Sequence, residues 1–162
     1  MFTVIDTNPS MFIFTPKARD MCRSCKRYGK KACCPPRVDS LEYYKDTIKQ
    51  YRYAQVILKK YIISDFDSEA EAGKISSLEL QSELLTTRNK ILNNGSIFVT
   101  CFGGGSCKNC KTCSDICRFP EKSLVPLEAA GIDVFSTLRL LGVELPKVIT
   151  DSFYRVGAIF YD

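Results

Sequence analysis

The chain has 162 residues, of which 45% are apolar, and a formal net charge of +5, which predict one globular domain spanning residues 1–162. No apolar run reaches the roughly 18–20 residues of a membrane span, and the first residues lack the basic and apolar regions of a signal peptide. We therefore expect a cytoplasmic protein without membrane insertion.

The first sixteen residues predict two short strands, at residues 2–5 and 11–14, joined by a turn at residues 8–10. Residues 17–37 then combine cysteines with positive charge: eight Lys and Arg stand against one acid. Such a surplus can mark a nucleic-acid surface, but Tyr28 is the only aromatic residue among these charges. We therefore favour a role in offsetting the charge of a buried anionic centre.

Four cysteines lie in this segment. Cys22 and Cys25 form a C-x2-C pair, as in metal knuckles, and Cys33 and Cys34 precede two prolines. The prolines favour an extended conformation at Cys34, in which adjacent side chains point to opposite sides. We interpret Cys34 as a metal ligand with Cys22 and Cys25, and Cys33 as a spare thiol or core residue. A zinc knuckle that only staples the loop is the alternative.

The middle of the chain predicts a helix, a strand and a longer helix. Residues 39–42 resemble a capping box and begin a helix to about residue 51, and residues 54–63 have the β-branched and aromatic content of a central strand. Residues 64–73 are acidic and predict a solvated loop rather than a hard-metal site. Periodic apolar residues in 76–93 predict a helix packed on the core. Its two apolar stripes are Leu78, Leu85 and Leu92, and Leu80, Leu84 and Ile91.

The segment 101–120, entered by a predicted strand at residues 96–101, carries the most specific motif. Its cysteines, spaced C-x2-C-x2-C-x3-C, are Cys107, Cys110, Cys113 and Cys117. This is the spacing with which bacterial ferredoxins bind [4Fe–4S] clusters. Structural zinc more often uses separated C-x2-C pairs and is the alternative. We expect the backbone of Gly103, Gly104 and Gly105 to approach the cofactor closely.

The remainder predicts a helical turn at residues 126–130, a helix capped by Asp133 and a closing strand at residues 153–161. The order of elements indicates an α+β domain with a mixed or largely antiparallel sheet. We expect about three helices and two cysteine-rich, cluster-binding loops.

These motifs resemble a family of predicted metal-binding proteins, a domain of unknown function of anaerobic bacteria and methanogenic archaea. The resemblance covers most of the chain. It rests on C-x2-C-x2-YGK-x3-CPP at residues 22–36, C-x2-C-x2-C at 107–113, and CR-x-P with EA-x-GIDV at 117–134. It implies iron–sulfur or other metal binding but no particular reaction. It also aligns Cys34 with the family's CPP cysteine, which leaves Cys33 and Cys101 as extra thiols.

The seven motif cysteines and either Cys101 or Cys33 make eight thiols, which is enough for two [4Fe–4S] clusters. The alternatives are one such cluster, or a single larger cluster held between both cysteine groups. Cys34 and Cys117, each ahead of a proline, are candidates for ligands exchanged between two clusters. The first hypothesis is an electron-transfer or accessory subunit of a larger anaerobic redox complex, in which the basic segment meets a protein partner. The alternatives are an enzyme or maturation factor with a substrate-accessible cluster, and a zinc-stapled interaction module.

Overall fold

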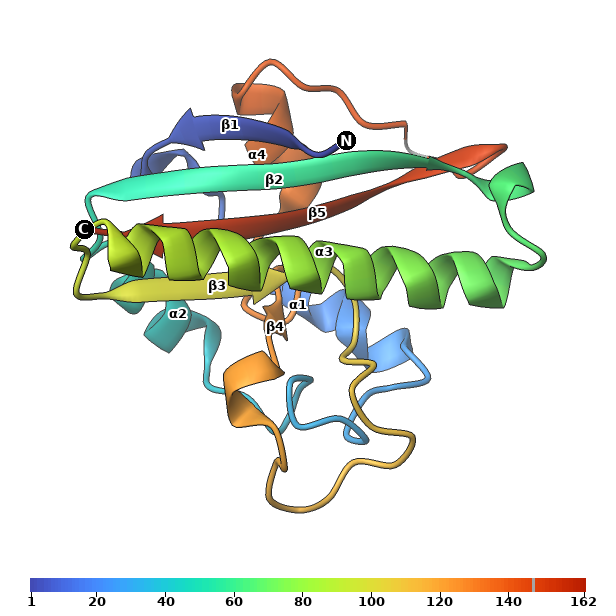
Figure 1. Cartoon of the computed structure of the whole chain (residues 1–162). Helices are drawn as coiled ribbons and strands as arrows, with labels where there is room; N and C mark the ends of the chain where they lie inside the picture. Colours follow the sequence, from blue (N-terminus) through green and yellow to red (C-terminus); the bar gives the residue numbers. More distant parts are fainter. Residues whose placement is uncertain (147) are drawn as a thin grey trace.

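Five strands form one sheet in the order β1-β2-β5-β3-β4 (Figure 1). The computed structural model describes residues 1–146 and 148–162 of the chain. Neighbouring strands are antiparallel except for β3 and β4, which are parallel. The strands are β1 Thr3–Thr7, β2 Tyr53–Ile62, β3 Val99–Gly103, β4 Val125–Pro126 and β5 Ser152–Tyr161. The largely antiparallel α+β architecture predicted from the sequence is confirmed.

The last strand of the chain, β5, lies at the centre of the sheet. It pairs along its whole length with β2, from Tyr161 opposite Tyr53 to Ser152 opposite Ile62, and its C-terminal half also pairs with β3. Residues 156–160 are all buried, as expected for a strand that is covered on both faces. This strand therefore fixes the position of β3, from which the second cysteine segment begins.

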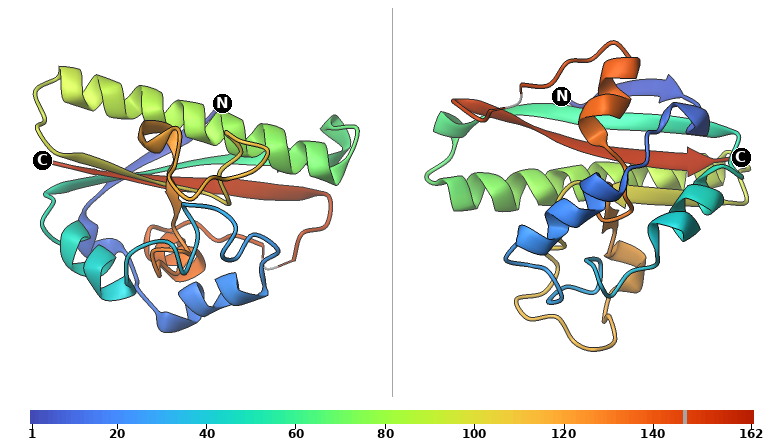
Figure 2. Two further views of the ribbon diagram at one scale, coloured as in Figure 1. Left: turned by 90° about the horizontal axis from the view of Figure 1, so that it is seen from below. Right: turned by 180° about the vertical axis from the view of Figure 1, so that it is seen from behind.

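The sheet lies between one long helix and a group of short ones (Figure 2). The helices are α1 Pro16–Asp20, α2 Leu41–Ile48, α3 Glu69–Asn93 and α4 Val134–Leu140, and short 3-10 turns include η2 Met21–Ser24 and η4 Pro120–Lys122. Helix α3 covers one face, where Ile57, Leu80 and Leu84 form a core cluster. The other helices lie on the opposite face, over a larger cluster that includes Phe102 and Phe160.

Helix α3 begins at Glu69, earlier than the sequence predicted. The Ser68 side chain accepts a hydrogen bond from the N–H of Glu71, and the Glu71 carboxylate accepts one from the N–H of Asp67. The prediction of an acidic loop over residues 64–73 was therefore wrong in its second half, because these acids cap and stabilise a first helical turn.

Of the two apolar stripes expected on α3, the one containing Leu80 and Leu84 is buried. In the other, Leu78 and Leu92 are 37% and 41% exposed. The predicted strand at residues 11–14 is reduced to a single bridge between Phe14 and Ile132. None of the helices in the described part of the chain is both long and apolar enough to cross a membrane.

Candidate metal centre

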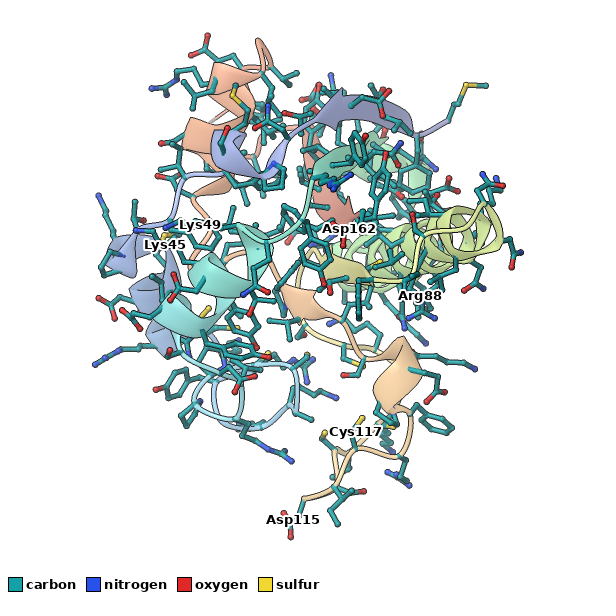
Figure 3. All side chains as sticks on the ribbon, turned by 90° about the vertical axis from the view of Figure 1, so that its left-hand side faces the viewer. Lys45, Lys49, Arg88, Asp115, Cys117 and Asp162 are labelled. Atoms are coloured by element: carbon teal, nitrogen blue, oxygen red, sulfur yellow. The ribbon has the colours of Figure 1, made fainter. Side chains whose placement is uncertain are left out.

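Two loops lie against each other at one edge of the sheet, below β3 and β4 in Figure 1. The first cysteine loop, residues 21–38, connects α1 to α2, and the second cysteine loop, residues 104–119, connects β3 to η4. Together they carry every cysteine of the chain except Cys101. Cys117 and Asp115 lie far out on the second loop, away from the sheet (Figure 3).

Backbone hydrogen bonds to sulfur join the two loops. The N–H of Cys107 donates to the Sγ of Cys33 over 3.3 Å, and the N–H of Ala32 donates to the Sγ of Cys113, also over 3.3 Å. Donors of this kind stabilise a thiolate. Each loop thus supplies a donor to a cysteine of the other.

Two cations of the first loop hold the backbone of the second. Lys31 is only 6% exposed, and its Nζ donates to the carbonyl oxygen of Cys110 over 3.0 Å. The guanidinium of Arg37 donates to the carbonyl oxygens of Ser114 and Asp115, at 2.8 and 2.7 Å. Part of the positive charge predicted around the cysteines therefore has a structural role: it holds the backbone of the second loop through hydrogen bonds.

Further positive charge gathers around the same loops. The pKa of Lys108 is lowered by burial and by the nearby charges of Arg27, Arg155 and Lys31. Cations that repel one another are stabilised by a negative charge between them. The loops therefore suit an anionic centre, such as a metal held by thiolates.

The four cysteines of the second loop line one small cavity of about 10 Å³. Lys31 and Ala32 of the first loop complete its wall. The pKa of Cys107 is raised by its hydrogen bond with Cys33 and by burial. The four cysteine residues of the motif at 107–117 thus border the same cavity.

In the first loop, Cys34 has the other cysteines around it. Its pKa is lowered by a hydrogen bond from Cys33, against opposing effects of burial and of Cys22, Cys25 and Cys107. The pKa of Cys33 is lowered by the hydrogen bond with Cys107, but the hydrogen bond with Cys34 and burial together bring it to about 11. Cys33 therefore lies where the two groups of cysteines meet.

The expectation that Cys33 and Cys34 point apart was wrong. Their Sγ atoms are 3.8 Å from each other. The reason is a turn: the N–H of Cys34 donates to the carbonyl of Lys31, and the N–H of Arg37 donates to the carbonyl of Cys34. The preference for extended structure before proline did not reveal this turn, which places Cys33 beside Cys34.

The structure places Cys101 away from the cysteine loops, in the core beneath α3. It packs with Ile57, Leu80, Leu84 and Ile159. Its Sγ is 3.9 Å from the carbonyl oxygen of Leu84, and burial raises its pKa to about 12. The position is that of a small apolar core residue.

The glycine run before the second loop has a packing role. A Cβ on Gly104 would lie 2.6 Å from the carbonyl oxygen of Val156 on β5 and 3.0 Å from Leu80. Gly105 has φ +84°, which favours glycine, and lies beside Arg155. Gly103 ends β3, where a Cβ would be 3.3 Å from Leu124. These contacts explain the three glycines, and their approach to a cofactor stays a prediction.

Within the described residues, no three cysteine or carboxylate side chains are gathered tightly enough to hold a single metal ion. A tetrahedral zinc site with Zn–S bonds of about 2.3 Å needs four sulfurs within roughly 3.8 Å of one another. A polynuclear cluster binds thiolates that are farther apart, because several irons and sulfides separate them. The sulfurs, N–H donors and cations of the two loops suit a metal centre held by thiolates.

Neither the curated proteins nor the solved structures contain a match to the chain. A family model described as "Predicted metal-binding protein (DUF2284)" matches residues 6–160. The match includes both cysteine loops and all five strands, although it begins within β1 and ends within β5. The chain therefore belongs to this family of predicted metal-binding proteins.

Proposed function

We propose that this protein binds iron–sulfur clusters and transfers electrons as a subunit of a larger redox complex. The observation that carries the proposal is the hydrogen bond from Cys107 N–H to Cys33 Sγ, which joins two cysteine groups into one region. Metal binding alone follows from the family. The step to iron–sulfur rests on the cysteine spacing and on the surroundings of the thiols.

The spacing favours iron–sulfur over zinc. The second loop has the C-x2-C-x2-C-x3-C pattern of ferredoxins, and its four cysteines share one cavity.

Each loop contributes four thiols to the proposed centres. The second loop would hold one cluster through Cys107, Cys110, Cys113 and Cys117, and the first would hold another through Cys22, Cys25, Cys33 and Cys34. In this assignment Cys33, rather than Cys101, is the eighth ligand, because Cys101 packs in the core. Neither Cys34 nor Cys117 then has to serve the other loop's cluster.

The surrounding groups would tune the centres. A bound cluster supplies one-electron redox chemistry at low potential. Lys31, Arg37 and the N–H donors of Ala32 and Cys107 would stabilise its added negative charge and so raise its potential. Because the two loops touch, electrons could pass from one centre to the other through the contact at Cys33.

A protein partner would approach the outer end of the second loop. Ile116 is 85% and Phe119 41% exposed, and both flank Cys117. The exposed cations of the first loop lie on the neighbouring surface and would attract an acidic partner. Thiolate ligands of this kind persist in a reducing compartment, so we place the protein in the cytoplasm.

Anaerobic purification followed by iron, zinc and acid-labile sulfide analysis tests the proposal. We expect brown protein with roughly eight irons and eight sulfides per chain, and an electron paramagnetic resonance signal after reduction. Cys110→Ser should remove about half of the iron, whereas Cys101→Ala, as the matched control, should retain it. Stoichiometric zinc without sulfide would contradict the proposal.

A further inference from the structure

The EA-x-GIDV motif at residues 128–134 contributes no thiol, and the fold explains most of it. Ala129 is fully buried, and its carbonyl accepts a hydrogen bond from Arg19. Gly131 has φ +89°, and a Cβ there would lie 2.4 Å from the side chain of Leu41. Asp133 caps α4 by accepting from the N–H of Ser136. These positions hold the chain in place beside α1.

Glu128 is the exception in this motif. Burial raises the pKa of its carboxyl group, while its own backbone N–H and the positive charge of Arg155 oppose this effect. The charge of Glu128 also contributes, after burial, to a raised pKa of Cys22. Arg155 thus acts on Glu128 through its charge, but no ion pair within 4 Å joins them in the described part of the chain.

The Glu128 side chain lines a cavity of about 460 Å³ between α1 and the start of α4. This volume lies within the range of small-molecule sites, which is roughly 300–1,000 Å³. Apolar side chains form much of the wall, among them Met21, Ile132 and Phe135. Met21 and Phe135 are 63% and 44% exposed, so both are accessible to a molecule in the cavity.

The charges of the cavity select the kind of ligand. Its second acid, Asp133, already accepts from the N–H and the hydroxyl of Ser136. Its one cation, Lys17, is exposed on α1. Glu128, which is half-buried, therefore remains as the group that a ligand would pair with, and a partly shielded carboxylate favours a cation.

We propose that this cavity binds a small amphipathic organic ammonium ion, whose charged group pairs with Glu128 while its apolar part contacts Met21 and Phe135. The Phe135 ring can attract the cation through its π face, and the flexible Met21 adapts to the shape of the ligand. Because Met21 directly precedes Cys22, the bound molecule lies beside the first cysteine loop. The site does not depend on which metal the cysteines hold.

Ligand-observed saturation-transfer NMR on the metal-loaded full chain tests this site with benzylammonium, benzyl alcohol and benzoate, which share a ring but differ in charge. A charge-assisted pair predicts that benzylammonium binds roughly tenfold more tightly than the alcohol and that benzoate binds least. Glu128→Gln should abolish the preference for the cation. Glu121→Gln, which removes the same charge from an exposed position, should preserve it.

Three results would overturn the proposal. One is the absence of saturable benzylammonium binding to the wild-type chain, and another is equal binding of the three probes. The third is a Glu128→Gln variant that keeps the preference for benzylammonium. If that variant also lost its metal, Glu128 would serve the metal centre and not a ligand in the cavity. Metal analysis of the same samples tests the cysteine centres separately.

Discussion

The backbone N–H of Cys107 donates a hydrogen bond to the Sγ of Cys33, although 74 positions separate the two residues in sequence. The Sγ of Cys33 is also 3.8 Å from that of Cys34. One thiol thus touches both cysteine groups. A substitution at Cys33 should therefore alter the contacts of both loops, whereas a substitution at Cys101 should alter only the packing of the core.

The first prediction compares these two extra thiols. Cys33→Ser should lower the iron and sulfide content by about half, because it removes the eighth ligand and weakens the contact between the loops. Cys101→Ala should retain full iron and lose about 1 kcal/mol of stability from the core. Iron and sulfide assays on anaerobic samples make the comparison. Equal iron loss in both variants, or none in Cys33→Ser, would reject our assignment of the eighth ligand.

The second prediction concerns the buried cation of the first loop. Lys31→Met removes a charge and the hydrogen bond to the Cys110 carbonyl while keeping a side chain of similar length. A reduced cluster would lose electrostatic stabilisation, so its midpoint potential should become more negative. Lys30→Met removes an exposed charge next to it and serves as the control.

Redox titration followed by electron paramagnetic resonance measures the midpoint potentials of the two variants. The shift in Lys31→Met should clearly exceed that in Lys30→Met, because exposed charges are screened by water and salt. Identical potentials in the two variants would show that Lys31 has only a structural role in holding the second loop.

Sequence reasoning succeeded where a local pattern determines the structure. The cap at Asp133 was predicted, and the helix start predicted at residues 39–42 contains the cap Ser40; both side chains accept from backbone N–H groups three residues later. The strand at residues 153–161 followed from its β-branched and aromatic content. These features depend on neighbours in the chain, so the sequence alone reveals them.

It was incomplete where the contacts come from distant segments. The sequence left open whether Cys101 or Cys33 joins the seven motif cysteines. Side chains alternate along β3, however, so Cys101 faces α3 while Phe102 faces the opposite core. Which of the two thiols lies beside the other cysteines could not be known before the sheet was assembled. The pairing of Cys33 with Cys107 was hidden for the same reason.

The third prediction contrasts two glycines. Gly104→Ala places a Cβ 2.6 Å from the Val156 carbonyl, so β3 and β5 must move apart, and we expect a loss of about 2 kcal/mol or more. Gly73→Ala lies within α3, where the nearest contact is an ordinary 3.7 Å to Arg155. It should stabilise the helix by roughly 0.5–1 kcal/mol.

Urea unfolding with matched metal content measures both changes. A Gly104→Ala variant as stable as the wild type would show that the strands are not packed as closely as the structure indicates. Its iron content is a separate measurement, which tests whether the glycine run also serves the cofactor.

The fourth prediction concerns the pH dependence of the contact between α3 and β2. The Glu79 carboxylate accepts hydrogen bonds from Lys59 Nζ at 2.7 Å and from the Tyr61 hydroxyl at 2.8 Å. The pKa of Glu79 is lowered by Lys59 first and by Tyr61 as well, against the effect of burial. A carboxyl whose pKa is lower in the folded state stabilises the fold above its unfolded pKa, and this stabilisation is lost as the pH falls.

The free energy of unfolding should therefore fall less steeply between about pH 5 and pH 3 in Glu79→Gln than in the wild type. Since the pair is partly exposed, the difference at neutral pH should not exceed about 1 kcal/mol. Urea unfolding across this pH range checks the slope, with Glu83→Gln as a control that removes an acid elsewhere on α3. If Glu79→Gln and Glu83→Gln followed the same pH profile, the contact of Glu79 with Lys59 and Tyr61 would contribute nothing to acid sensitivity.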